Sequence, residues 1–330
     1  MPSKDNFSFQ VQSILHCLDE YSVSRDDLIE LLVAIKFNNH YGCIPESTHI
    51  KLVNLFCRSS GRIQEIIHAF RIKPVNHLLN SIVLESNLFK TTPAEFSQII
   101  RDLNDNGYAQ LPFKLPPSKC AEILEYSSTC KHYCLIRNNE CTERYEISSL
   151  DHLQKGTLSA HMYESDLISS KTISDIFFDK VIMGIASFYL RTDVCLHHGS
   201  LWHSYKTEGD YADSELAQLF HFDLDEFRWL KLFIFLTDVS SDNGPHVYIP
   251  GSHVPGTKSL ELLSRGYARI PDDDMNRFHS KTSWKELTCP AGTLVFADTR
   301  CWHKGTSVNC GQRSILQPEY SPSTFSKRFF

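Results

Sequence analysis

Apolar residues recur every three or four positions through the first 88 residues, the spacing of helices that bury one face. One such segment begins at Ser24, and Asp27 three residues later gives it the form of a capping box. Similar spacing recurs over residues 48–60 and 61–72. The pattern predicts an N-terminal helical subdomain over residues 1–88. It carries no evident chemistry, so it either shields the rest of the chain or makes a homodimer or partner contact.

A second helical pattern begins near residue 91. Thr92 is suited to cap a helix that has Pro93 in its first turn. The pair Asn106-Gly107 is a typical end for the same helix, because glycine readily adopts the left-handed conformation found there. We expect a short strand and a further helix to follow.

From about residue 180 the pattern changes to short runs rich in aromatic and β-branched residues, which is typical of strands. Turn pairs such as Asn243-Gly244 separate them. The runs cover residues 181–190, 194–205, 229–239, 246–252, 292–298 and 313–320. Many short strands without regular helices between them predict a jelly-roll. Residues 89–330 are therefore expected to form one mainly β domain with flanking helices, an α+β arrangement.

Composition and charge exclude several kinds of partner. The chain has 33 lysines and arginines against 39 acidic residues, a net charge of −6, so no broad basic surface is available for nucleic acid or anionic lipid. No apolar run reaches membrane-spanning length, and the N-terminus does not resemble a signal peptide. The 11 cysteines are scattered without CxxC pairs, which favours reduced thiols. We expect a soluble cytoplasmic protein without a nucleic-acid or membrane partner.

The candidate chemistry begins with His221 and Asp223, two positions apart in an otherwise apolar run. In a strand, residues i and i+2 point to the same face, so both side chains would be available to one metal ion. An exposed strand face can also carry this pair without any function. The spacing alone therefore leaves both interpretations open.

A second segment adds His303 and Arg313. If the intervening turn is centred near Val308, Arg313 lies nearly opposite His303 across a hairpin. Together with His221 and Asp223, His303 completes two imidazoles and one carboxylate, the set that holds non-haem Fe(II) and leaves positions open for substrate and oxygen. Arg313 supplies a planar group suited to a carboxylate. The joint pattern favours a metal site.

In three segments the chain resembles the phytanoyl-CoA dioxygenase (PhyH)-like family of Fe(II)/2-oxoglutarate-dependent oxygenases. They are "HFDLDEFRWLKLFIFLTDVSSDNGPHVYIPGSH", "AGTLVFADTRCWHKGTSVNCGQRSILQPEY" and, more weakly, "FSQIIRDLNDNGYAQLP". The resemblance covers roughly residues 91–321. It implies a double-stranded β-helix of the jelly-roll or cupin-like kind, with His221, Asp223 and His303 as catalytic iron ligands. It also implies that Arg313 holds the distal carboxylate of 2-oxoglutarate.

By this resemblance, 2-oxoglutarate would take two open metal positions and O2 the third, yielding succinate and CO2. The expected outcome is hydroxylation of an unactivated C–H bond of a small-molecule metabolite, free or bound to a carrier or CoA. Asp223 disfavours a halogenase, because related halogenases carry a small residue at that ligand position. Two alternatives remain: a cupin-like metalloenzyme that does not use 2-oxoglutarate, and a non-catalytic jelly-roll binding protein.

Several further residues are candidates for the pocket. Lys231 either pairs with an acidic group of the co-substrate or substrate, or reaches solvent at a strand edge. Thr306 either adds a hydroxyl to the co-substrate carboxylate site or only forms a turn. Trp202, Ser204 and Tyr205 resemble segments that line the pocket in this family.

A long polar insertion covers residues 254–288. Such an insertion over a rigid β-scaffold is either a lid or a solvated surface loop. Arg265, Arg269 and Arg277 within it are candidates to meet an anionic substrate. His253, just before the insertion, is expected to support the site or end a strand rather than to bind the metal.

Overall fold

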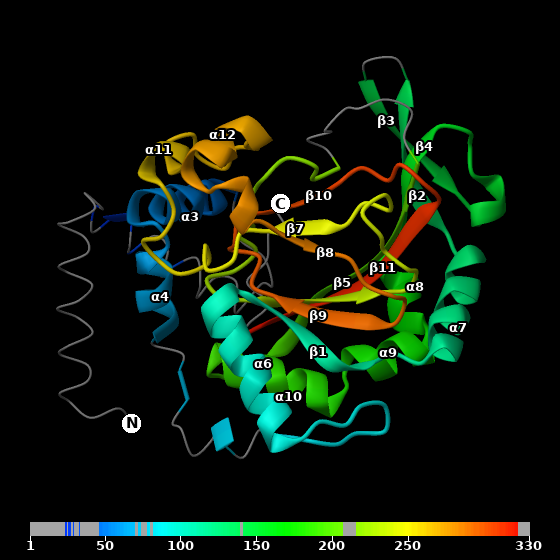
Figure 1. Cartoon of the computed structure of the whole chain (residues 1–330), viewed down its shortest axis with the longest axis horizontal. Coiled ribbons are helices and arrows are strands. Elements are labelled where there is room, and N and C mark those ends of the chain that lie inside the picture. Colours follow the sequence, from blue (N-terminus) through cyan, green and yellow to red (C-terminus); the bar gives the residue numbers. More distant parts are fainter. Residues whose placement is uncertain are drawn as a thin grey trace.

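A large antiparallel sheet, a smaller sheet on one side of it and helices on the other side make up the central part of the chain (Figure 1). The structure is a computed structural model. It describes residues 46–69, 82–138, 141–206 and 216–322, together with residues 24, 26, 27, 29, 33, 72, 73, 78 and 79.

The large sheet has eight strands in the order β1-β9-β6-β11-β5-β4-β2-β3. Their bounds are β1 Tyr108–Lys114, β2 His132–Asn138, β3 Cys141–Ile147, β4 Thr157–Met162, β5 Cys195–Tyr205, β6 Leu230–Phe235, β9 Thr293–Ala297 and β11 Gln312–Ser321. The small sheet has the order β10-β7-β8, with bounds β7 His246–Tyr248, β8 Lys285–Leu287 and β10 His303–Gly305. The predicted jelly-roll with flanking helices is confirmed.

Helices cover the outer face of the large sheet, at the bottom and right of Figure 1. They are α6 Pro93–Asn106, α7 Pro117–Ser128, α8 Glu164–Ser169, α9 Lys171–Phe177 and α10 Lys180–Leu190, with a 3-10 turn, η1, at Leu150–His152. The predicted ends of α6 are confirmed, since Thr92 and Glu95 form a capping box and Gly107 has a φ of +81°. No helix in the described ranges has the length and apolar character needed to cross a membrane.

The prediction of a strand over residues 181–190 is wrong, because this run forms α10. The Asp179 carboxylate accepts hydrogen bonds from the backbone N–H groups of Val181 and Ile182, at 2.9 and 3.2 Å, and so begins the helix. Eight of its residues are buried. A helix that is apolar on nearly all sides shows no clear periodicity, and it therefore resembles a buried strand in sequence.

Alternation along β6 separates the two faces of the large sheet. Leu230, Leu232 and Ile234 pack into the core beneath the helices. Phe233 and Phe235 point the other way, toward the small sheet, where they pack with Tyr248. The space between the two sheets therefore receives every second side chain of β6.

The predicted N-terminal helices are present as α3 Glu46–Ser59 and α4 Arg62–Ala69. At Ser24 the predicted helix start is also seen, since the N–H of Asp27 donates to Ser24 Oγ at 3.0 Å. Most of the residues predicted to continue this helix, and residues 1–23, lie outside the described residues. Phe56 of α3 stacks on Phe222 of the β domain with ring centroids 4.8 Å apart.

Ion pairs also connect α4 to the β domain. Glu65 accepts two hydrogen bonds from Arg228, at 2.8 and 2.9 Å, and one from Arg300 at 2.5 Å. Arg300 in turn donates to both oxygens of Asp298, at 2.9 and 2.7 Å. Arg228 and Arg300 belong to the loops that carry the predicted metal ligands, so α4 contacts the supports of the site directly.

The insertion at 254–288 contains α11 Leu260–Leu263, α12 Asp272–Phe278, a 3-10 turn, η2, at Lys281–Ser283, and strand β8. Its apolar residues Leu262, Leu263 and Met275 are buried in a cluster that includes Phe56 and Trp302. In Figure 1, α11 and α12 lie beside α3. The insertion is therefore packed against the N-terminal helices and is not a solvated surface loop.

Candidate metal centre

The small sheet positions the two predicted histidine ligands. His221 and His303 exchange two backbone hydrogen bonds of 2.9 Å each, which sets their rings side by side with centroids 4.3 Å apart. The predicted strand around His221 is reduced to isolated bridges at Phe220 and His221. Asp223 is held by the bond from its own N–H to the carbonyl oxygen of Thr299, at 2.8 Å.

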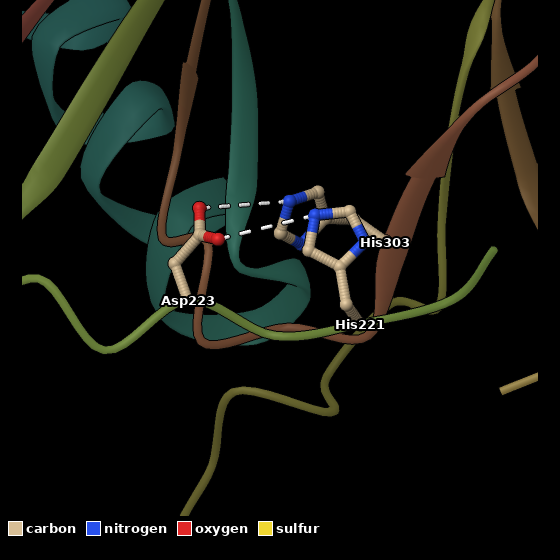
Figure 2. A group of neighbouring side chains, drawn as sticks. All are labelled: His221, Asp223 and His303. Carbon is tan, nitrogen blue, oxygen red and sulfur yellow. Dashed lines mark ion pairs between the residues drawn. The ribbon is translucent and has the colours of Figure 1, made fainter. Parts of the chain in front are cut away.

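The three predicted ligands converge, as Figure 2 shows. Asp223 Oδ1 lies 3.9 Å from His221 Nε2, and Asp223 Oδ2 lies 3.7 Å from His303 Nε2. One potential ligand atom from each residue lies within 4.8 Å of the other two. His221 and His303 are buried, and Asp223 is 15% exposed at its side chain. The geometry suits one divalent ion bound to two imidazoles and a carboxylate.

Backbone carbonyl groups fix the orientation of both imidazoles. His221 Nδ1 lies 2.9 Å from the carbonyl oxygen of Leu219, and His303 Nδ1 lies 2.9 Å from that of Cys301. Because a carbonyl oxygen only accepts, each ring carries its proton on Nδ1 and presents the lone pair of Nε2 to the centre. Burial, and then the neighbouring His303, lower the pKa of His221 to about 3. Burial also lowers the pKa of His303. Both rings are therefore neutral and ready to bind a metal.

Lys231 lies beside this centre, on the inward face of β6. Its ammonium group is 2.8 Å from Asp223 Oδ2, 2.7 Å from Asp225 Oδ2 and 3.5 Å from Glu319 Oε2. Burial alone would lower the pKa of Lys231, but the three carboxylates outweigh it and raise that pKa well above its ordinary value. The acidic partners of Lys231 in the structure are thus the protein's own. The prediction that it pairs with co-substrate or substrate stays untested.

Arg313 approaches the cavity from the large sheet. The predicted hairpin with His303 is wrong, because β10 pairs with β7 while β11 crosses to the large sheet and pairs with β5 and β6. Arg313 lies opposite Ser204 of β5 in that pairing, and its Nη2 donates to Ser204 Oγ at 3.2 Å. Its Nη1 donates to the Gly244 carbonyl oxygen. Arg313 and His303 nevertheless line the same cavity.

The Arg313 guanidinium is buried without an acidic partner among the described residues. It is 6% exposed, and its Nε forms no hydrogen bond. Burial lowers the pKa of Arg313 to about 10, and no carboxylate of the described residues raises it. A buried cation of this kind is costly unless an anion joins it. This part of the cavity therefore suits a carboxylate.

A tight turn brings the backbone close to Arg313. Gly244 has a φ of +74°, and a Cβ there would lie 2.8 Å from the Thr306 carbonyl oxygen and 3.3 Å from Arg313 Nη1. Only glycine suits both the conformation and the close approach. The hydroxyl of Thr306 donates to the Pro245 carbonyl oxygen at 2.9 Å, so it helps to hold this turn while lining the cavity.

All the predicted pocket residues line one cavity of about 410 Å³ that contains the metal ligands and Arg313. Trp202, Ser204 and Tyr205 form part of its wall on β5, and Lys231 and Thr306 also contribute. Of the described residues that line it, none belongs to the insertion at 254–288. The insertion thus contributes no described residue to the cavity lining, and its role as a lid stays a hypothesis.

Some residues of the site were not singled out from the sequence. Tyr133 and His161 line the cavity from β2 and β4 and stack with ring centroids 4.8 Å apart, and His246 lines it from β7. Asp225 and Glu319, the further partners of Lys231, were also missed. Asp225 could have been found from the sequence, because it lies two positions after Asp223, just as Asp223 lies two positions after His221.

The arginines of the insertion differ in their surroundings. Arg265 pairs with Asp274 at 2.6 Å, and Arg277 lies 3.6 Å from Glu261. Arg269 is close enough to lower the pKa of the two ligand imidazoles, although burial has the larger effect, and its Nη1 is buried without a hydrogen bond. His253 Nε2 lies 3.1 Å from the carbonyl oxygen of Asn104 near the end of α6, away from the metal ligands.

The sequence model of the family described as "Phytanoyl-CoA dioxygenase (PhyH)" matches residues 103–314. No curated protein matches the chain.

Among solved structures, HygX from Streptomyces hygroscopicus with nickel and 2-oxoglutarate bound is 13% identical, with a TM-score of 0.49 over 72% of this chain and 89% of that one. AviO1 from Streptomyces viridochromogenes Tue57 is 15% identical, with a TM-score of 0.46 over 70% and 96%. EctD from S. alaskensis in its apoform is 16% identical, with a TM-score of 0.45 over 73% and 81%.

Proposed function

The chain belongs to the phytanoyl-CoA dioxygenase family, and from this premise we propose that it is an Fe(II)- and 2-oxoglutarate-dependent oxygenase that acts on a small molecule. One observation carries the proposal. A cavity of about 410 Å³ is lined both by a two-histidine, one-carboxylate cluster and by a buried arginine that has no acidic partner among the described residues. Such a pair of sites suits a metal ion and a dicarboxylic acid.

His221, Asp223 and His303 would hold the iron. The donor set is two neutral imidazoles and one carboxylate, which suits Fe(II) and leaves coordination positions open. The chemistry that the bound iron supplies is the oxidative decarboxylation of 2-oxoglutarate by O2, with release of succinate and CO2. The role of the three ligands is to fix that chemistry at one end of the cavity.

Arg313 would bind the distal carboxylate of 2-oxoglutarate. Its guanidinium is fixed by Ser204 and by the Gly244 carbonyl, so little side-chain entropy remains to be lost when the anion binds. Its Nε is a buried donor without a partner, which a carboxylate oxygen would satisfy. Thr306 and the Ser204 hydroxyl also line this cavity and are candidates for further contacts to that carboxylate.

The remaining walls would receive the substrate. Trp202, Tyr205 and Phe233 line the cavity with large rings, which bind apolar parts of a substrate and limit the access of water. Ser159 and Gln317 offer polar groups along the same cavity. We propose hydroxylation of a C–H bond as the outcome, and Asp223 disfavours halogenation because it fills the position that a halide would need.

Succinate release tests the proposal. Purified protein supplied with Fe(II), 2-oxoglutarate and air is expected to form succinate, even without the true substrate, at a rate above that of Asp223→Ala. Equal rates in the two proteins would contradict the proposal. Iron-dependent oxidation without succinate, unaffected by Arg313→Gln, would instead favour the cupin-like metalloenzyme.

A further inference from the structure

Lys231 forms a direct ion pair with one of the three proposed metal ligands, Asp223. Its ammonium lies 2.8 Å from Asp223 Oδ2, which is also 3.7 Å from His303 Nε2, while the other carboxylate oxygen, Oδ1, lies 3.9 Å from His221 Nε2. Both the lysine and the aspartate are largely buried, at 12% and 15% side-chain exposure. The two oxygens of Asp223 therefore have different surroundings.

Two more carboxylates hold the ammonium in place. Glu319 lies opposite Lys231 in the pairing of β11 with β6, so both side chains point to the same face of the sheet. Asp225 lies 2.7 Å from the ammonium and Glu319 3.5 Å. Glu319 Oε1 is in turn 2.9 Å from His197 Nδ1. The lysine thus cannot swing toward the centre of the cavity without losing buried ion pairs.

We propose that Lys231 is a positioning residue that keeps Oδ2 of Asp223 occupied, so that the aspartate offers the metal Oδ1 alone. The inference rests on the proposed function. A divalent ion with six positions must keep three of them free for a chelating keto acid and O2. If both oxygens of Asp223 bound the metal, a fourth position would be filled. Repulsion between the ammonium and the metal ion disfavours that arrangement.

The obvious test variant is Lys231→Met, which keeps the length and apolar character of the side chain and removes its charge. It also leaves Asp225 and Glu319 without their shared cation, and a buried carboxylate in that state is destabilising. A second variant, Lys231→Met with Asp225→Asn, reduces that excess charge. The double variant keeps the proposal testable if the single one folds poorly.

Lys304→Met is the matched control. Lys304 is also a largely buried lysine, with 10% side-chain exposure and an ion pair of 2.5 Å to Asp272. It follows His303 in β10, and its ammonium lies over the Phe220 ring at 5.0 Å, outside the lining of the cavity. Loss of this lysine removes a buried charge of the same kind without changing the surroundings of Asp223.

Two dissociation constants separate positioning from a structural role. The first is that of Fe(II) for each protein under argon, and the second is that of 2-oxoglutarate for each iron-loaded protein, from its visible charge-transfer band. In both Lys231 variants we expect iron to bind within about threefold of wild type or more tightly. We expect 2-oxoglutarate to bind at least about tenfold more weakly, because the second oxygen of Asp223 would compete with the keto acid for a metal position. Lys304→Met is expected to change neither constant by more than about threefold.

Two results would overturn the proposal. One is an unchanged dissociation constant for 2-oxoglutarate in both Lys231 variants. The other is a parallel loss of iron and 2-oxoglutarate binding, which would assign Lys231 a purely structural role. If wild-type protein itself gives no charge-transfer band with iron and 2-oxoglutarate, the proposed function fails rather than this inference alone.

Discussion

Replacing Glu65 by glutamine removes the negative charge that joins α4 to the loops behind the metal ligands. Glu65 bonds to Arg228 at 2.8 Å and to Arg300 at 2.5 Å, whereas glutamine keeps the shape of the side chain and loses both ion pairs. Arg228 follows Asp223 in sequence, and Arg300 precedes His303, two of the proposed metal ligands. The substitution therefore tests whether the N-terminal helices are a separate subdomain or part of one folding unit with the β domain.

The surroundings of Glu65 set the expected loss of stability in Glu65→Gln. Burial alone would raise the pKa of Glu65, but Arg300 and Arg228 outweigh it and lower that pKa from 4.5 to about 2. At 1.36 kcal/mol per pKa unit, the charge of Glu65 contributes at most about 3 kcal/mol to the free energy of unfolding. The Glu65 side chain is 31% exposed, and Arg300 keeps its bonds to Asp298, so both screening and the remaining partner reduce the loss. We expect Glu65→Gln to lower the free energy of unfolding by about 2 kcal/mol.

Thermal unfolding measures this loss. At about 2.1 cal/mol/K of unfolding entropy per residue, 2 kcal/mol lowers the Tm of a chain of 330 residues by about 3 °C. Glu125→Gln on the exposed face of α7 is the control and is expected to leave the Tm unchanged. We also expect one transition rather than two in the wild-type protein. The reasoning would be refuted if the Tm of Glu65→Gln equalled that of Glu125→Gln. It would also be refuted if the N-terminal helices of the wild-type protein unfolded in a separate, earlier transition.

Three further predictions concern acid stability and the site. Because the pKa of Glu65 is lower in the folded chain than in the unfolded one, its contribution is present above about pH 4.5 and is lost as the pH falls toward 2; the Tm of wild type should then approach that of Glu65→Gln. Asp223→Ala should weaken Co(II) binding at least about tenfold in a competition titration, and equal affinity would contradict its role as a ligand. Gly244→Ala should raise the dissociation constant of 2-oxoglutarate, because the new Cβ would press on the Thr306 carbonyl and Arg313; unchanged binding in calorimetry would contradict this.

The cluster of His221, Asp223 and His303 was predictable because such side chains are rare in an apolar run. His221 and Asp223 stand two positions apart among large apolar residues, and His303 follows a clear strand. The structure brings the three together, but not by the route expected. Isolated bridges rather than a long strand position His221, because the chain leaves the small sheet after one pair with His303.

Pairing between strands could not be predicted from the same pattern. The turn around Cys310 and Gly311 was expected to return the chain beside His303, yet it carries the chain from the small sheet to the large one. Local apolar alternation tells which residues face inward and does not tell which strand lies alongside. For the same reason the partners of Lys231 stayed hidden, since Glu319 reaches it only through the pairing of β11 with β6.

Anaerobic titration of Fe(II) and 2-oxoglutarate into wild type and Arg313→Gln tests the central claim most directly. The account predicts a weak visible charge-transfer band in the wild-type protein that requires both additions, and a band in Arg313→Gln that appears only at much higher 2-oxoglutarate concentration. Folded, iron-loaded wild-type protein that gives no band, or an Arg313→Gln protein that titrates like wild type, would contradict it.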